Sequence, residues 1–599
     1  MAPVSTSDFL SSEFDYLVLG AGTAGLAVAA RLSEDPNVRV GVIEAGELVV
    51  DRPEVNIPGM VGRAVGSDLD WKFETIPQEN ANNRVIRQPR GKVVGGTSAL
   101  NFEAWGRASA AEYDAYEVLG NEGWNWPEFL KYLKKAETFT PPPPEIAKQH
   151  HVNYEAQYHG TDGPIQMTFP VWFNDLHLPF LEASAARGIP YNSDNGDGKN
   201  NGSFTGTFCI DPRTGTRSYS TTGYYLPNAE RKNLVLLTGA HITRILFEDT
   251  QGSDVVATGV EFLKDGQTLV AKAKREVVLC AGTHQTPQIL ELSGIGKSEI
   301  LKKHGIKQIV DLPVGEGLQD HVWVHFIFEI SKDIFTLESL RESPEVLGEI
   351  MRTYKEEKKG MMASVFSAYS FAPLSSVMTP SELEAHGNEI VNGDSFSKTP
   401  FGRKYASLYK DWAHDDGHAQ LEVLQTPGFL TRVDLKPKPD THYNTFMAGL
   451  LQPLSRGSVH IGSSDPLAPP VIDPAFLKNP LDLKLLVKIV KLCRDIMNSD
   501  AYKAANPVAY DPPNEMQSDE ELEEFVRKTA NPFFHPVGTA SMLPKEDGGV
   551  VDKTLKVYGT KNLRVVDASV MPFVLSCHIQ STIYAIAEKA ADIIKAANA

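Results

Sequence analysis

The sequence predicts a mixed α/β and α+β protein in which one α/β domain is interrupted by a second, inserted domain. Residues 14–45 have the pattern of strand, glycine turn, helix and strand, and residues 562–598 return to strand, loop and helix. Between about 325 and 470, charged helical stretches alternate with β-like runs. Residues 479–530 have an amphipathic helical pattern, and the last helix is expected from about Ser581. Because an α/β unit opens the chain and another closes it, we expect both ends in one sheet and the other domain between them.

The size and composition indicate a large globular protein. The chain has 599 residues, 42% hydrophobic and 22% charged, which is enough for a sizeable core and two intertwined domains. The formal net charge of −18 would repel nucleic acids and anionic lipids, so we expect neither as a partner. No apolar run approaches the roughly 18 residues that a membrane-spanning helix needs, so we expect no membrane span.

The N-terminal residues and the cysteines indicate in which cellular compartment the protein is expected. Residues 1–13 are polar and rich in serine, without the basic and then apolar order of a signal peptide. We therefore expect an intracellular protein if the chain is complete, although a processed mature form of a secreted protein would look the same. The cysteines at 209, 280, 493 and 577 lie far apart and lack metal-ligand spacing. They leave room for one disulfide but not for a disulfide scaffold, and we expect no metal site.

The stretch from Gly20 to Gly25 has the spacing of a dinucleotide-binding turn. The apolar run Tyr16–Leu19 leads into it, and a small-residue helical pattern, Leu26–Leu32, leads out. Gly-x-Gly-x-x-Gly alone is a weak signal and is often a structural turn. Here the strand, the helix and a later acidic residue are in register, so we predict a dinucleotide site.

Each member of this pattern has a physical role. Gly20 permits the sharp turn, Gly22 lets the backbone approach a pyrophosphate, and Gly25 lets helix and strand pack closely. The free N–H groups at the start of the helix then face the phosphates. Glu44, 19 residues after Gly25 at the end of the run Val40–Ile43, can accept hydrogen bonds from ribose hydroxyls.

Two further segments could bind phosphate or a ring, although each alone would be interpreted as structural. Residues 91–101 form a second glycine-rich loop with hydroxyl and amide side chains, which could bring backbone N–H groups to a ligand. Residues 282–296 follow an apolar strand and open a helix. Together with residues 20–25, they resemble the glucose–methanol–choline (GMC) oxidoreductases, which bind FAD.

The resemblance extends from residue 14 to about residue 596, in the family's order. It implies a glutathione-reductase-type FAD-binding domain with an inserted substrate domain built on an antiparallel sheet. Further matching segments are 314–321, 455–459, 535–539 and 565–569. The implied FAD-binding domain comprises residues 14–165, 220–324 and 530–599, and the implied substrate domain comprises residues 166–219 and 325–529.

The resemblance also implies which residues line the FAD site. The ADP half would meet the first glycine turn and its acidic residue, and the flavin would lie between the second glycine loop and the C-terminal segment. The implied positions are Gly20, Gly22, Thr23, Ala24, Gly25, Glu44, Ala45, Trp71, Val94, Thr97, Asn101, Ile242, Asp567, Ala568, Ile579 and Gln580. Leu100 stands where some family members attach FAD covalently through a histidine, so we expect non-covalent FAD.

His535 and His578 fall where the family's catalytic pair falls. A lone histidine is more often structural than catalytic, but oxidising an alcohol requires removal of a proton and a hydride. A neutral imidazole can take the proton near pH 7, and a second imidazole can hold the oxygen. We interpret His535 as the general base and His578 as the hydrogen-bond partner, with an exchange of these roles or a shared proton as alternatives.

Phe102, Phe533 and Phe534 favour an apolar substrate pocket, with simple core packing as the alternative. Sugar-oxidising relatives carry an arginine four residues before the catalytic histidine, where this chain has Asn531. This difference disfavours glucose. We predict oxidation of an aromatic, allylic or furanic primary alcohol to its aldehyde, as in aryl-alcohol oxidase-like members of the family.

The sequence does not identify the electron acceptor. We expect O₂, reduced to hydrogen peroxide, with a dehydrogenase that uses a quinone-type acceptor as the alternative. A non-redox lyase such as a hydroxynitrile lyase, a photodecarboxylase and a flavin-binding protein without turnover could also use this fold. The retained histidine pair disfavours the last two.

Overall fold

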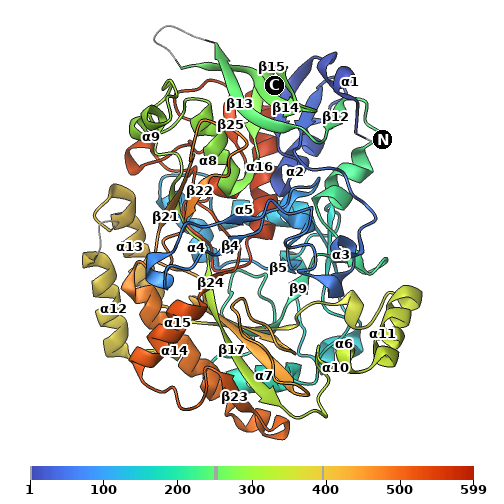
Figure 1. Cartoon of the computed structure of the whole chain (residues 1–599), viewed down its shortest axis with the longest axis vertical. Helices are drawn as coiled ribbons and strands as arrows, with labels where there is room; N and C mark the ends of the chain where they lie inside the picture. Colours follow the sequence, from blue (N-terminus) through green and yellow to red (C-terminus); the bar gives the residue numbers. More distant parts are fainter. Residues whose placement is uncertain (1–2, 249–253, 394–396, 599) are drawn as a thin grey trace.

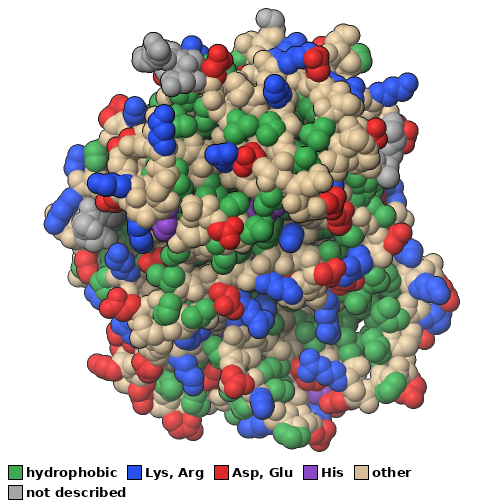
Figure 2. Space-filling model, turned by 45° about the horizontal axis from the view of Figure 1, so that its top comes forward, with side chains coloured by type: hydrophobic (Ala, Val, Ile, Leu, Met, Phe, Trp, Pro, Cys, Tyr) green, Lys and Arg blue, Asp and Glu red, His purple; other side chains and the backbone are tan. Residues whose placement is uncertain are grey.

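The computed structural model describes residues 3–248, 254–393 and 397–598. Figure 1 shows one sheet in the upper part of the molecule, near both chain ends, and a second sheet around β17 in the lower part. This arrangement confirms the predicted mixed fold. Figure 2 shows acidic and basic side chains interspersed over one face of the molecule. No helix within the described ranges is long and apolar enough to cross a membrane.

The upper sheet joins the two ends of the chain. Its strand order is β12-β2-β1-β15-β14-β13, and β25 also pairs with β15. Since β1 and β25 both run parallel to β15, the prediction that the ends share one sheet is confirmed. The strands are β1 (Phe14–Leu19), β2 (Val40–Ile43), β12 (Leu234–Leu237), β13 (His241–Glu248), β14 (Val256–Lys264), β15 (Gln267–Leu279) and β25 (Leu563–Val565).

The lower sheet is antiparallel, as the resemblance implied. Its order is β23-β17-β20-β19-β18-β8, and β24 also pairs with β17. The strands are β8 (Gly202–Thr205), β17 (Val322–Ile330), β18 (Ala368–Ala372), β19 (Leu421–Thr426), β20 (His442–Leu450), β23 (Val508–Asp511) and β24 (Asn531–Pro532). The boundaries of the two domains stay a prediction.

One local prediction is wrong. The periodicity of residues 479–530 predicts helices throughout, and the structure has α14 (Pro480–Met497) and α15 (Asp519–Thr529) there. Between them, however, the short strand β23 pairs antiparallel with β17. A strand of four residues has little local signal, and here its hydrogen bonds come from a partner more than a hundred residues away in the sequence.

Three helices lie side by side beneath the upper sheet. The C-terminal helix α16 (Gln580–Ala597) packs against α2 (Thr23–Leu32) and α5 (Trp126–Ala136). It begins one residue before the predicted start at Ser581. The ion pair between Arg31 Nε and the fully buried carboxylate of Glu588, 2.8 Å apart, connects α2 to α16. Helices α2 and α16, from opposite ends of the chain, therefore hold each other in place.

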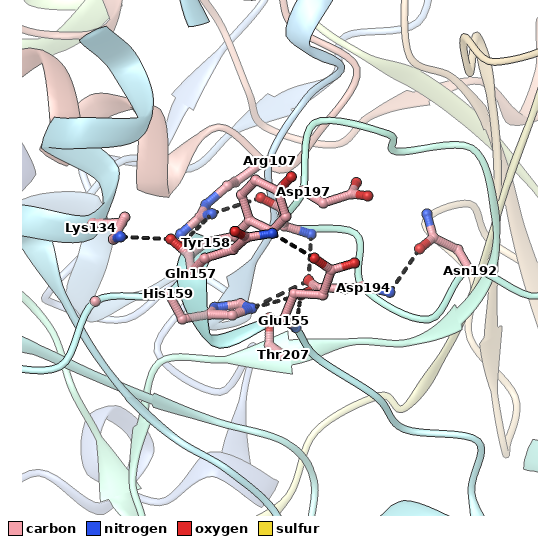
Figure 3. A network of polar contacts seen from close by, with 12 residues as sticks. Arg107, Lys134, Glu155, Gln157, Tyr158, His159, Asn192, Asp194, Asp197 and Thr207 are labelled. Carbon is pink, nitrogen blue, oxygen red and sulfur yellow. Dashed lines mark hydrogen bonds and ion pairs between the residues drawn. The ribbon is translucent and has the colours of Figure 1, made fainter. Parts of the chain in front are cut away.

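A buried guanidinium organises the polar network in Figure 3. Arg107 Nη1 donates to the backbone carbonyl oxygens of Tyr158 and Gly196, each at 2.7 Å, and Nη2 lies 2.7 Å from Glu137 Oε1. The side chains of Arg107 and Glu137 are only 2% and 1% exposed. Asp194, in the same network, accepts from the Gly196 N–H at 2.8 Å. The pair therefore fixes two surface loops from inside.

We predict that Arg107→Met lowers the free energy of unfolding by about 3–5 kcal/mol. The change removes the guanidinium paired with the buried Glu137 carboxylate, which keeps only the His159 ring, 3.5 Å away, as a basic partner. Denaturant titration of the purified protein measures the change. Arg213→Met is the matched control, since the side chain of Arg213 is 73% exposed in its ion pair with Asp211 and exposed pairs contribute at most about 1 kcal/mol. Equal midpoints for the two variants would contradict the prediction.

Candidate active site

One cavity has walls from both sheets. On the upper side it is lined by the first glycine turn, from Gly20 to Ala24, and by the second glycine loop near Thr97. On the lower side it is lined by Trp323, Leu424 and Met447, which lie on β17, β19 and β20. The cavity therefore lies where a cofactor held by the upper domain could meet a substrate held by the lower one.

The structure brings nearly all of the predicted site residues to this cavity. Both histidines, the three phenylalanines and all but two of the implied FAD positions line it. The exceptions are Gly25 and Val94. Val94 is fully buried; its N–H donates to the Glu47 carbonyl, and its carbonyl accepts from Thr221 Oγ1. Its implied place beside the flavin stays a prediction.

The glycines of the first turn stand where a side chain would collide. Gly20 has a φ of +105°, and a Cβ there would lie 2.6 Å from the Cys280 carbonyl oxygen. A Cβ on Gly25 would lie 1.9 Å from the Gly20 carbonyl oxygen, so Gly25 permits the close packing of helix on strand. A Cβ on Gly96 would lie 2.7 Å from Gly22 Cα, so the two glycine-rich loops touch each other.

Two helix N-termini open onto the cavity. Gly22 caps α2 and Ile579 caps α16, and neither cap makes a side-chain hydrogen bond. The first N–H groups of both helices are therefore left to a ligand, and the helix dipoles favour negative charge there. An elongated dianionic dinucleotide with a second polar end fits this pair of donors, so the residues present suit FAD.

Two buried carboxylates hold the loops at the cavity wall. Glu44 accepts from the N–H groups of Ala21 and Gly46, each at 2.8 Å, and burial raises the pKa of Glu44 to about 7. Asp567 Oδ2 accepts from the Gly282 N–H at 2.9 Å and from Thr286 Oγ1 at 2.6 Å. Asp567 thereby ties the start of α8 (Gly282–Leu292) to the loop that precedes the C-terminal segment.

The amide of Asn101 has a fixed orientation at the cavity wall. Its Nδ2 donates to Gln580 Oε1 at 2.7 Å, and its Oδ1 accepts from Arg217 Nη1 at 2.7 Å. Because Arg217 can only donate, the oxygen of Asn101 must face it. The second glycine loop and the start of α16 are thereby linked across the region implied for the flavin.

The catalytic candidates meet at this cavity. The rings of His535 and His578 have their centroids 4.8 Å apart, with 66° between the ring planes. Phe533 lies parallel to His535 at 6.1 Å and tilted to His578 at 5.9 Å. Phe534 has a φ of +66°, a conformation that bulky residues rarely adopt. Residues far apart in sequence therefore form one compact site.

Each of these histidines has its own buried partner. His578 Nε2 lies 2.8 Å from Glu422 Oε1, and the Glu422 side chain is fully buried. His535 Nδ1 lies 2.9 Å from His321 Nδ1, and His321 Nε2 lies 3.0 Å from the Leu575 carbonyl oxygen. Burial lowers the pKa of His535 well below its usual value, and His578, His321 and Arg90 add to this effect.

The sequence alone does not assign roles to these two partners. His321 ends the matching segment 314–321, so its position was visible but its contact was not. Glu422 is the charged residue inside the apolar run Leu421–Leu424, and such a charge in a buried strand is a signal for a specific partner. Only the fold shows that these partners are His535 and His578.

Aromatic rings form most of the remaining wall near the histidines. Phe102 stacks on Phe366 with centroids 5.9 Å apart, and Tyr369 meets His578 edge-on at 5.8 Å. Trp323 lies 5.7 Å from Phe533. This part of the cavity presents flat apolar surfaces to a substrate.

Comparison with known proteins agrees with this geometry. The N-terminal GMC oxidoreductase domain matches residues 14–323, and the C-terminal domain matches residues 453–587. Among curated relatives, the chain is 36% identical to the dehydrogenase citC of Monascus ruber, over 99% of this chain and 98% of the relative. It is 35% identical to the GMC oxidoreductase family protein Mala s 12 of Malassezia sympodialis, over 98% and 93%.

Solved structures with the same fold include other flavoenzymes. An FAD-dependent oxidoreductase from Chaetomium thermophilum superposes with a TM-score of 0.90 at 30% identity, covering 98% of this chain and all of that one. A fungal aryl-alcohol oxidase gives 0.87 at 29% identity, covering 98% and 99%. A variant of the formate oxidase of Aspergillus oryzae gives 0.84 at 29% identity, covering 98% and 99%.

We predict that Gly25→Ala weakens FAD binding or prevents folding of the first turn, because the new Cβ would lie 1.9 Å from the Gly20 carbonyl oxygen. The ratio of flavin absorbance to protein absorbance after purification measures the loss. Gly348→Ala is the control, because Gly348 lies in helix α11 (Pro344–Glu357) with open space around it. A fully flavin-loaded Gly25→Ala protein would show that the turn tolerates a side chain.

Proposed function

The chain belongs to the GMC oxidoreductase family of FAD-dependent enzymes, and on this basis we propose that it oxidises an aromatic, allylic or furanic primary alcohol to the aldehyde. The observation that carries the proposal is the pair of imidazoles, His535 and His578, 4.8 Å apart in a cavity with aromatic walls. We further propose that O₂ accepts the electrons and becomes hydrogen peroxide.

In the proposed reaction, the alcohol loses a proton from oxygen and a hydride from carbon. His535 takes the proton: the O–H bond breaks and an N–H bond forms on the ring. His578 donates a hydrogen bond to the same oxygen and fixes the direction of the C–H bond. Bound FAD supplies the acceptor for the hydride. The aromatic walls exclude water from the charged oxygen during the step.

The different partners of the two rings support this assignment of roles. The buried carboxyl group of Glu422, 2.8 Å from His578 Nε2, holds the His578 ring in place, and a fixed ring is suited to orient the alcohol oxygen. The partner of His535 is an uncharged imidazole, and burial keeps His535 itself neutral by lowering its pKa. A neutral imidazole is the form that can accept a proton.

Features of the cavity support an aromatic substrate. Phe102, Phe533 and Phe534 line it, whereas Asn531, at the position of the sugar-binding arginine, donates to the Thr529 carbonyl instead. At the rim, Arg432 lies over the Phe534 ring at 5.9 Å and makes no hydrogen bond or ion pair with any residue that the structure describes. A negatively charged ring substituent could pair with this guanidinium.

Non-covalent attachment of FAD is supported by the position of Leu100. Leu100 lines the cavity and carries no nucleophile. We therefore predict that acid denaturation releases free FAD into the supernatant, as measured by its absorbance spectrum. Yellow colour that stays with the precipitated protein would contradict this prediction.

We predict that His535→Ala slows reduction of the flavin by alcohol by ~10²-fold or more, because the proton of the hydroxyl loses its acceptor. Anaerobic stopped-flow mixing of enzyme with benzyl alcohol measures the rate. Full flavin occupancy of the variant is the control for folding. Near-normal reduction would show that another group is the base.

A panel of alcohols tests the substrate and the acceptor together. We expect benzyl alcohol and 4-(hydroxymethyl)benzoate to have higher kcat/KM than glucose, since the cavity walls are aromatic. Peroxide release in air supports an oxidase, whereas reduction of a quinone dye without peroxide supports the dehydrogenase alternative. No flavin bleaching by any alcohol in anaerobic buffer would favour a lyase on the same fold.

A further inference from the structure

We propose that His321 is a positioning residue: it holds the proton of His535 on Nδ1 and so presents the bare Nε2 of that ring to the alcohol. The inference deepens the proposed function and rests on it for the role of His535. It depends on the hydrogen-bond chain from the Leu575 carbonyl through His321 to His535.

The far end of this hydrogen-bond chain places a proton on His321. A backbone carbonyl has no hydrogen to donate, so the Leu575 oxygen can only accept. At 3.0 Å from this oxygen, His321 Nε2 must therefore carry a hydrogen. This contact removes one of the two neutral tautomers of His321.

The surroundings of His321 keep its ring uncharged. Its side chain is fully buried, and its polar contacts, which are the His535 ring and the backbone of Leu575 and Leu451, include no carboxylate. Burial lowers the pKa of His321 to about 3, with the nearby His578 ring as a smaller cause. The ring is therefore neutral near pH 7. Because its one hydrogen is on Nε2, its Nδ1 is bare and can only accept.

The contact between the two rings then identifies the donor. His535 Nδ1 lies 2.9 Å from the bare Nδ1 of His321, and one of the two nitrogens must donate. The donor is therefore His535 Nδ1–H. Since burial also keeps His535 neutral, its Nε2 has no hydrogen and carries the free lone pair that a general base needs. Without an acceptor at Nδ1, nothing in this hydrogen-bond chain would select that tautomer.

The backbone around His321 keeps this geometry rigid. The His535 N–H donates to Asp320 Oδ1 at 2.7 Å, and the Phe533 N–H donates to the His321 carbonyl at 3.0 Å. Gln319 and Val537 exchange two backbone hydrogen bonds, at 2.9 and 3.1 Å. The segment 319–321 is therefore bound along its length to the segment that carries His535, and His321 has little freedom to turn away.

The ¹⁵N resonances of the histidine rings in the FAD-loaded enzyme test the tautomer directly. An unprotonated ring nitrogen resonates far from a protonated one, and the spectrum of His535→Gln identifies the signals of His535. We expect a protonated Nδ1 and an unprotonated Nε2 for His535 at neutral pH, and the reverse for His321. A protonated Nε2 on His535 would overturn the inference, and this measurement does not depend on turnover.

Variants of His321 test the consequence for the reaction. His321→Leu keeps the bulk but removes the acceptor, so we expect flavin reduction to slow by ~10-fold or more with little change in KM. His321→Asn can place an amide oxygen near the position of Nδ1, so we expect it to restore most of the rate. His386→Leu is the matched control, because His386 is buried in α12 (Pro380–Asn392), away from the cavity lining.

The outcomes separate this inference from the proposed function. If His535→Ala loses the reaction while His321→Leu keeps the wild-type rate, the inference is wrong and the proposed function stands. If no alcohol reduces the flavin of the wild-type enzyme, the proposed function fails, and the ring resonances alone decide the tautomer. If His321→Leu does not fold or bind FAD, the Asn variant and the wild-type resonances still give the answer.

Discussion

The contacts of one short segment, Gln319–His321, bring the two histidine-bearing loops together. Gln319 pairs through its backbone with Val537, and its side-chain oxygen accepts from the Val574 N–H at 2.8 Å. His321 contacts both loops as well, through the ring of His535 and the carbonyl of Leu575. Since this segment binds both loops at once, the geometry of the candidate site depends on it, although it comes from a third region of the chain.

The different partners of His535 and His578 explain how two chemically identical side chains can differ in role. His578 faces the buried carboxylate of Glu422, which lies on β19 of the lower sheet, and His535 faces the uncharged ring of His321, the residue before β17. Water is largely excluded from both partners, so each contact acts at a low effective dielectric. Removing either partner would therefore leave the ring that it contacts without a buried hydrogen-bond partner.

The part of the cavity that is implied for FAD depends on a different constraint: the glycine-rich loops there carry no side chains at their glycines. The loops at Gly22 and Gly96 touch, and the two uncapped helices α2 and α16 direct free N–H groups at the same cavity. These donors belong to backbone that packing already holds, so little reorganisation is needed when an anionic ligand binds. The glycines of these loops are recognisable from the sequence, because a Cβ at most of these positions would collide with neighbouring backbone.

The sequence by itself determined the features that arise from local backbone geometry: the opening β1–α2–β2 unit, the places of Gly20 and Gly25, the start of α16 and, through the resemblance, the two histidines. The tertiary structure alone decided that β23 is a strand and that His535 and His578 have different partners in His321 and Glu422. The physical reason is that steric limits on a turn act between neighbouring residues, whereas a hydrogen-bond partner is supplied by whichever distant segment the packing brings into contact.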